Sequence, residues 1–284
     1  MLLQILVSGF FLGGIYALMA CGLSLILGVM RIVNLTHGCF FTLGAYILFS
    51  FILRANVNPF IGMVFTIIVL FFIGSILEWL IIKRIKYSEI NMMVLTLALA
   101  IAGEEFIRIA WGPKYLQIPP LIEGEFRLGH IYVSNQRILA CFIGLFMLFL
   151  LMLFLKKTKT GKAIRMVQQI PETAALMGIN VRTISMVVFG LGVALAGAAG
   201  SLWAPMYITY PAMGWTPLLI SFAIVILGGM GSLGGSILGG FLFGFATLLT
   251  SMYISSGLVN VIPFITLFIV LLIRPTGFFG KDIF

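Results

Sequence analysis

Charged side chains are scarce in this sequence. Only 9% of its 284 residues are Asp, Glu, Lys or Arg, and Asp282 is its single aspartate. Soluble domains carry about 25% charged residues. Hydrophobic residues make up 62% of the chain, and the mean hydropathy is +1.21. Polar side chains are therefore too few to cover a water-soluble globule, which excludes an ordinary soluble enzyme, a secreted domain and a disordered chain.

The groups that enzymes use are scarce as well. Two histidines and one aspartate leave little for acid–base chemistry. No serine stands in a nucleophile turn, and no Gly-x-x-x-x-Gly-Lys-Ser/Thr phosphate loop is present. The three cysteines lie in apolar runs, where a free thiol behaves as a small hydrophobic side chain. We therefore expect no catalytic residue, metal or cofactor in this chain, and any ATP hydrolysis in a separate protein.

Long apolar runs dominate the sequence instead. A helix needs about 20 apolar residues to cross a bilayer, and a backbone inside hydrocarbon must satisfy its own hydrogen bonds, which favours helices. The predicted segments are 2–30, 35–53, 59–82, 92–109, 138–155, 183–204, 216–230, 237–253 and 258–273. The second and seventh are short or rich in glycine, as broken or re-entrant helices are. The sequence thus predicts an all-α polytopic membrane protein, a single domain over 1–284 with eight or nine transmembrane helices.

Basic residues are concentrated on one predicted face. With nine spans, 12 of the 17 Lys and Arg residues fall on that face, six of them in the loop 156–182, where Glu172 is the only acid. Cytoplasmic loops carry such an excess, so the N-terminus is expected outside and the C-terminus inside; eight spans would move the N-terminus across. This distribution accounts for the net charge of +9. Nucleic-acid binding is not expected, because no basic face carries interleaved aromatics.

The longest loop of the opposite face is 111–137. It holds three prolines and a short β-like piece, His130–Ser134. Its three basic residues face two acids, so its net charge is only +1. Two interpretations remain open for this loop: a docking surface for an external partner, and a solvated connector.

Glycine is concentrated in the apolar segments. The chain has 32 glycines, many at a spacing of four residues, at which small side chains let two helix backbones approach closely in lipid. Examples are Gly9-Gly13, Gly192-Ala196-Gly200 and Gly235-Gly239. The spacing predicts tight helix packing.

The basic loop 156–182 contains the pattern of a short helix. Pro171 suits a first helical position, Glu172 suits the positive end of a helix dipole, and Gly178 suits a C-terminal cap. The helix-forming residues between them are Ala174, Ala175, Leu176 and Met177. A solvated loop would not need these apolar residues, so the helix is expected to lie along the membrane surface and to present them to a partner.

Polar groups inside a membrane are costly, so each is a candidate for function. Asn34, Thr36 and His37 lie between the first two apolar runs. They either line a translocation path or form a turn whose Asn and Thr cap the next helix. Gly228 and Gly229 belong to a run with too much glycine for a stable helix. That run is either a broken helix beside the path or a plain turn.

Two carboxylates, Glu104 and Glu105, lie in the fourth apolar run. Glu104 and Arg108 are four residues apart, so they are able to pair on one helix face. The group is either an ion pair near the outer end of the span or, in a coupled carrier, a site that carries protons.

The basic loop resembles a motif of the permeases of ATP-binding-cassette importers. Glu172, Ala174 and Gly178 are similar to the Glu-Ala-Ala…Gly loop whose helix docks into the ATP-binding subunit; Thr173 replaces the first Ala, and Ile170 replaces a usual Asn. The wider chain resembles the branched-chain amino-acid permeases of the hydrophobic amino-acid uptake family, in its shorter type, nearly end to end. The other matching motifs are 22–31, Asn34, 37–38, 43–46, 195–200, 228–240 and 274–280.

The resemblance implies a permease of the bacterial cytoplasmic (inner) membrane that forms a translocation path for hydrophobic or branched-chain amino acids or related small solutes. It implies four kinds of partner: a second homologous permease in a heterodimer, two ATP-binding subunits, a periplasmic substrate-binding protein, and membrane lipid. The residues it assigns to ATPase coupling are Gly161, Arg165, Pro171, Glu172, Thr173, Ala174, Ala175, Leu176 and Gly178. The alternative is a proton-coupled secondary amino-acid carrier that uses Glu104 or Glu105.

Overall fold

The computed structural model describes residues 2–85, 88–128, 131–253, 256–258, 261–274 and 277–279. Some of the expectations above rest partly on other residues. These are Lys86 and Lys281 of the basic face, His130 of the β-like piece, and Pro275, Thr276 and Gly280 of the C-terminal motif, and they lie outside the described residues.

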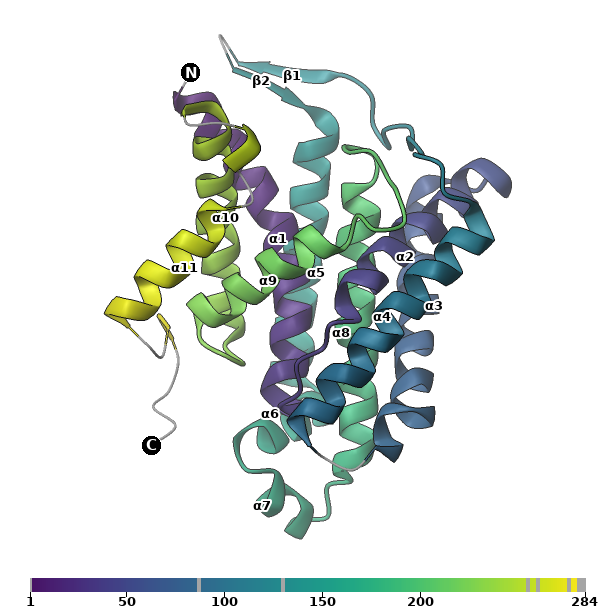
Figure 1. The fold of residues 1–284 in the computed structure, drawn as a ribbon, viewed down its shortest axis with the longest axis vertical. Helices are drawn as coiled ribbons and strands as arrows, with labels where there is room; N and C mark the ends of the chain where they lie inside the picture. Colours follow the sequence, from purple (N-terminus) through teal and green to yellow (C-terminus); the bar gives the residue numbers. More distant parts are fainter. Residues whose placement is uncertain are drawn as a thin grey trace.

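The described chain is a bundle of α-helices, which confirms the predicted all-α membrane fold (Figure 1). Seven helical segments within it are long and apolar enough to cross a membrane. They are α1 (Leu2–Met30), α2 (His37–Phe49) with the π-helix η1 (Ser50–Arg54), α3 (Pro59–Leu80) with the 3-10 helix η2 (Ile82–Arg84), α4 (Glu89–Trp111), α5 (Asn135–Lys157), α8 (Val181–Trp203) and α10 (Leu233–Tyr253).

Two further apolar helices are shorter. α9 (Trp215–Gly228) has 14 residues and α11 (Ile262–Ile273) has 12, and a 3-10 turn, η3 (Ser256–Leu258), lies between α10 and α11. At 1.5 Å per residue, α9 is about 21 Å long, less than the roughly 30 Å hydrocarbon core. α9 is thus a single helix too short to span this core, whereas the second predicted segment is long enough to cross a membrane as α2 with η1.

The bundle has two distinct ends. At one, β1 (Glu125–Leu128) and β2 (Ile131–Ser134) form an antiparallel hairpin, close to the start of α1 (Figure 1); we call this the hairpin end. The β-like piece predicted there is confirmed for its described residues. At the other, the chain between α5 and α8 forms α6 (Lys159–Gln169) and α7 (Pro171–Leu176), and we call this the α7 end.

The core lies around α1 and α8, which pack against each other. α1 also packs against α10, and α8 packs against α2 and α3. Glycine makes these contacts close: a Cβ on Gly13 would lie 2.7 Å from the Cα of Phe241 in α10, and a Cβ on Gly200 would meet the backbone oxygen of Phe41 in α2. The predicted small-residue packing is confirmed at these crossings.

Large apolar side chains cover the outward faces of α3, α4 and α5. Examples with about half or more of the side chain exposed are Val64, Phe65, Phe72, Val94, Phe106, Phe142 and Phe146. Continuous apolar surface of this extent is unstable in water. These faces suit contact with lipid or with another apolar protein surface.

Candidate functional site

The basic loop 156–182 begins with a well-formed helix start. The Thr158 hydroxyl accepts a hydrogen bond of 2.9 Å from the Gly161 N–H, which caps α6. Gly161 lies so close to the end of α5 that a Cβ there would be 2.5 Å from the Cα of Leu155. The glycine thus lets α6 fold back directly against α5. Ile164 and Val167, one turn apart on α6, are buried against the bundle, while Arg165 between them is exposed.

The helix predicted from Pro171 onward is confirmed as α7. Pro171 occupies its first turn together with Glu172. Gly178 follows the helix with φ = +82°. Its N–H donates to Ala175 O at 3.0 Å, and the Ile179 N–H donates to Ala174 O at 3.1 Å. This pair of bonds is a Schellman cap, in which glycine avoids the strain of a left-handed residue.

α7 exposes apolar side chains at the α7 end of the molecule. Ala174 is buried against the rest of the protein, with 1% exposed, whereas Leu176 is 88% and Met177 69% exposed. The loop 156–182 that carries them also holds six basic residues: Lys156, Lys157, Lys159, Lys162, Arg165 and Arg182. Leu176 and Met177 together form a small exposed apolar patch within a basic segment.

Gln168 joins this loop to the membrane helices. Its Nε2 donates a hydrogen bond of 2.8 Å to the Gly231 oxygen, in the turn 229–232 between α9 and α10. A Cβ on Gly28, near the end of α1, would lie 2.9 Å from the same Nε2 and 2.8 Å from the Gly231 Cα. Three elements therefore meet at one point, and two glycine backbones leave just enough room for the Gln168 amide.

Gly228 and Gly229 form the start of that turn. α9 ends at Gly228, and Gly229 adopts φ = +92°. Gly228 packs against the backbone of Gly235, with no room for a Cβ on either residue. The Ser232 hydroxyl accepts from the Gly235 N–H at 3.1 Å at the start of α10. The glycine run is thus a turn that joins two tightly packed helices.

The segment that follows α11 closes over the same turn. The N–H of Phe278 donates to Leu227 O at 2.8 Å, and that of Phe279 to Gly228 O at 3.2 Å. These bonds satisfy carbonyl groups at the end of α9, which have no partner inside the helix. The end of α9 is therefore fixed both by Gln168, through Gly231, and by residues 277–279.

Asn34 and Thr36 lie in the non-helical link between α1 and α2, and His37 is the first residue of α2 beside them. Each is at most 2% exposed. The Asn34 Oδ1 accepts from the Thr36 N–H at 3.1 Å, the Thr36 hydroxyl donates to Thr96 O at 2.8 Å, and the His37 Nε2 lies 3.1 Å from Met19 O. The Asn34 contact satisfies a backbone N–H of the link, and the other two tie Thr36 to α4 and His37 to α1.

Two side-chain atoms of this group remain without a hydrogen-bond partner among the described residues, Asn34 Nδ2 and His37 Nδ1. Buried polar atoms of this kind are uncommon in folded proteins. They leave the link able to bind a polar group, although none of its three predicted residues lines the cavity described next.

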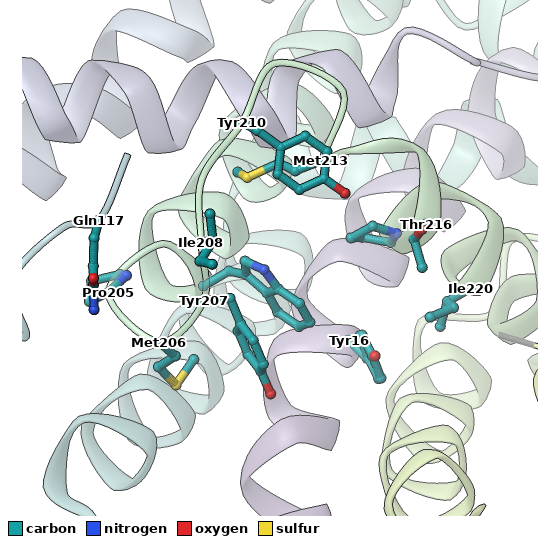
Figure 2. Close-up of a pocket in the computed structure, with 12 residues that line it drawn as sticks. Tyr16, Gln117, Pro205, Met206, Tyr207, Ile208, Tyr210, Met213, Thr216 and Ile220 are labelled. Atoms are coloured by element: carbon teal, nitrogen blue, oxygen red, sulfur yellow. The ribbon is translucent and has the colours of Figure 1, made fainter. Parts of the chain in front are cut away.

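A cavity of about 510 Å³ lies nearer the hairpin end, between α1, α8 and α9 (Figure 2). Its walls are aromatic and apolar: Tyr16 from α1, Trp203 from α8, Ile220 from α9, and Tyr207 and Met213 from the connecting segment 204–214. All the residues that line it are uncharged. Ligand pockets in proteins have volumes of about 300–1,000 Å³ and mostly apolar walls, so the cavity has the size and chemistry of a small-molecule site.

The loop 111–137 holds the segment 204–214 in place through its described residues. Leu116 and Thr209 exchange two backbone hydrogen bonds, of 2.8 and 2.9 Å. The rings of Tyr115 and Tyr210 lie 5.6 Å apart. Gln117, from the same loop, lines the cavity. The loop therefore supplies one residue of the cavity lining, and its hydrogen bonds hold the segment that covers the cavity.

Packed side chains close the cavity toward the α7 end. Beyond Tyr16 and Ile220, the buried residues of α1 and α9 include Leu23, Ile224 and Leu227, each at most 1% exposed. Tyr16 and Gly28 are separated on α1 by 12 residues, or about 18 Å. The apolar contact between α1 and α9 thus lies between the cavity and the turn that Gln168 holds.

Glu104 has partners on two sides. Its carboxylate accepts a hydrogen bond of 2.9 Å from the Trp215 indole at the start of α9 and lies 3.1 Å from the Arg108 guanidinium. Glu105 also lies near Arg108, at 3.4 Å, and is half exposed. The predicted i,i+4 ion pair is confirmed, and Glu104 joins α4 to α9.

Several of these residues were not singled out by the sequence. Tyr16 and Trp203 stand in apolar helices, where an aromatic residue is typical of a core, and Gln168 stands in a polar helix, where glutamine is typical of a solvated face. Among the described residues, no group of three His, Cys, Asp or Glu side chains is placed to hold a metal ion.

The chain matches a known protein family along most of its length. Residues 5–271 match the model of the family described as branched-chain amino acid transport system / permease component. The chain is 27% identical to the high-affinity branched-chain amino acid transport system permease protein LivH of Escherichia coli, over 98% of this chain and 96% of that protein. It is 28% identical to the corresponding protein BraD of Pseudomonas aeruginosa, over 98% and 96%.

One solved structure has a similar fold. It is PsaBC from Streptococcus pneumoniae in complex with Fab, with a TM-score of 0.55 and 14% sequence identity, over 96% of this chain and 92% of that chain. At this identity the likeness concerns the fold alone.

Proposed function

This chain belongs to the permease family of branched-chain amino acid transport systems, and from that premise we propose that it is the membrane-spanning subunit of an ATP-driven importer. In this proposal it pairs with a second, homologous permease. Two ATP-binding subunits dock at its α7 end, and a periplasmic substrate-binding protein delivers hydrophobic amino acids at its hairpin end. The family membership and the relatives named as branched-chain amino acid permeases support a transport role.

The exposed Leu176 carries the proposal for ATPase docking. It projects from a helix that is capped at its C-terminus and buried on its Ala174 side, so its exposure is built into the fold. Burying a leucine side chain in a partner stabilises the contact by about 1.5–3 kcal/mol. The basic residues of the same loop favour the cytoplasm, where ATP-hydrolysing subunits work. We therefore place the N-terminus outside.

Replacement of Leu176 tests the docking surface. We expect Leu176→Glu to abolish co-purification of the ATP-binding subunits and ATP-dependent uptake, because a charge would be buried in an apolar contact. The permease should still accumulate in the membrane, since the side chain is exposed. The matched control is Ile122→Glu, an equally polar change at an exposed apolar residue of the outer loop. Normal ATPase binding by Leu176→Glu would overturn the docking proposal.

Gln168 gives the docked ATPase a direct route to the membrane helices. It belongs to the same loop as α7, and its amide bonds the turn between α9 and α10. A displacement of α6 would therefore pull on the end of α9, next to the apolar contact that closes the cavity. At the turn between α9 and α10 this route consists of one side-chain hydrogen bond and two glycine contacts, beside the packing of α6 against α1, α5 and α8.

The alternative function is a proton-coupled carrier that uses Glu104 or Glu105. The bonds of Glu104 to Trp215 and Arg108 favour a structural role instead. We expect Glu104→Gln to keep at least about half of the uptake, because the amide oxygen still accepts from the indole and the lost ion pair is partly exposed. Uptake by reconstituted permease under a proton gradient without ATP, abolished by Glu104→Gln, would favour the carrier.

A further inference from the structure

We propose that the cavity between α1, α8 and α9 binds the apolar side chain of the transported amino acid and leaves its α-ammonium and α-carboxylate groups outside. The inference rests on the proposed transport function and its substrate class, and it extends them to a defined site. That class comprises amino acids with aliphatic or aromatic side chains, and excludes those with charged side chains.

Aromatic rings give the cavity a preformed wall. The rings of Trp203 and Tyr207 are stacked, with centroids 4.1 Å apart and an angle of 23° between their planes. The ring of Tyr16, on α1, has its centroid 6.1 Å from that of Trp203. Figure 2 shows Tyr16, Tyr207 and Ile220 around one space. Stacked rings have little rotational freedom to lose when a ligand binds, so apolar contact with them is gained at low entropic cost.

The lack of charge in the lining sets the substrate class. A carboxylate or ammonium buried without a partner is strongly disfavoured, and none of the lining residues is charged. The cavity therefore rejects glutamate and lysine side chains. For the same reason the charged α-groups of any amino acid remain at the exposed edge of the cavity, whose lining includes the exposed polar residues Gln117 and Thr216.

The position of the cavity gives this site a place in transport. It is closed toward the α7 end by the packed contact of Leu23 with α9. A substrate held there would reach the opposite end only after α1 and α9 separate. The cavity thus suits the substrate-receiving state of an importer that opens toward the α7 end in a later step.

Chemical protection of an introduced thiol tests binding directly. Thr216→Cys places a thiol at the exposed edge of the cavity, and we expect leucine to slow its reaction with a small maleimide. When leucine occupies two-thirds of the sites, the thiol should react about threefold more slowly, because only the unoccupied third is open to the reagent. Glutamate at the same concentration should have no effect. Ile122→Cys on the outer loop is the control thiol, and the unmodified protein gives the background of its own three cysteines. Equal protection by leucine and glutamate, or none by leucine, would overturn the assignment.

Transport kinetics provide a second test with the complete transporter in liposomes. We expect Tyr207→Ala to raise the KM for leucine about tenfold or more, as loss of an aromatic anchor does, and to leave the KM for alanine unchanged, because alanine has little side chain to contact the wall. Tyr253→Ala, at an exposed tyrosine on α10, should change neither value. An equal rise for leucine and alanine would contradict a side-chain site.

The two proposals fail in different ways. If the unmodified transporter shows no ATP-dependent uptake of any amino acid, the proposed function is wrong. If it transports leucine normally and neither Thr216→Cys protection nor the Tyr207→Ala kinetics respond to the side chain, only the cavity assignment is wrong.

Discussion

Gln168→Ala is expected to lower ATP-dependent uptake about tenfold while the ATP-binding subunits remain bound, because coupling between two sites is commonly worth 1–3 kcal/mol. The side chain donates to Gly231 O at 2.8 Å and lies between two glycine backbones. Its loss would disconnect α6 from the turn of α9 and α10 and leave the docking surface on α7 intact. Uptake, ATPase activity and subunit co-purification, measured on the same preparation, separate these effects.

Two further variants sharpen this test. Gln169→Ala changes the neighbouring glutamine, which is exposed on the same helix, and should transport normally. Gln168→Glu keeps the volume of the side chain but removes the N–H donor, so it should resemble Gln168→Ala if the hydrogen bond transmits the movement. If Gln168→Glu and Gln168→Ala both transport normally while Leu176→Glu does not, the movement passes to the membrane helices elsewhere.

Gly44→Ala should destabilise the folded protein by about 1–3 kcal/mol, the usual cost of overpacking. A Cβ on Gly44 would lie 2.5 Å from the Cα of Gly197. Because the obstacle is the backbone of α8, no side-chain rotation relieves it, and α2 would have to move away. That movement would also weaken the 3.1 Å hydrogen bond from the Ser201 hydroxyl to Gly44 O. The change is measured as the unfolding temperature of the purified permease in detergent.

Gly234→Ala is the control for this effect. Gly234 lies in α10 and has no atom within 4 Å of where its Cβ would be. Alanine is favoured over glycine by up to about 1 kcal/mol in a helix interior, and Gly234 is the second residue of its helix, so this variant should be as stable as the parent or slightly more stable. The intrinsic preference for alanine applies to both positions. Equal stability of the two variants would therefore show that the crossing of α2 and α8 does not need glycine.

Local features of the structure could be predicted from the sequence. The start of α7 is specified by Pro171 and Glu172, and its C-terminal cap by Gly178, all within eight residues. The helix and its cap are present as expected. The apolar runs likewise gave the positions of the main helices, because apolar length alone decides where a helix forms in lipid. Small-residue spacing predicted that helices cross closely, although it did not identify which helices meet.

The candidate site was only partly predictable. The polarity of Asn34, Thr36 and His37 marked them as candidates, and all three are buried where α1 meets α2. The cavity was not marked, because its aromatic residues have the same composition as a core. It arises from Tyr16 and Trp203, which approach each other only when α1 packs on α8.

The sequence by itself determined that this is a helical membrane protein with one strongly basic face and a capped helix in the basic loop. Each of these depends on residues within one or two turns, or on composition, and needs no distant partner. The tertiary structure alone decided that Gln168 bonds Gly231, 63 residues away, and that a cavity remains between α1, α8 and α9. Where every face of a helix is hydrophobic, helical periodicity does not indicate which face meets which neighbour. The packing of the whole bundle therefore decides the partner of each face.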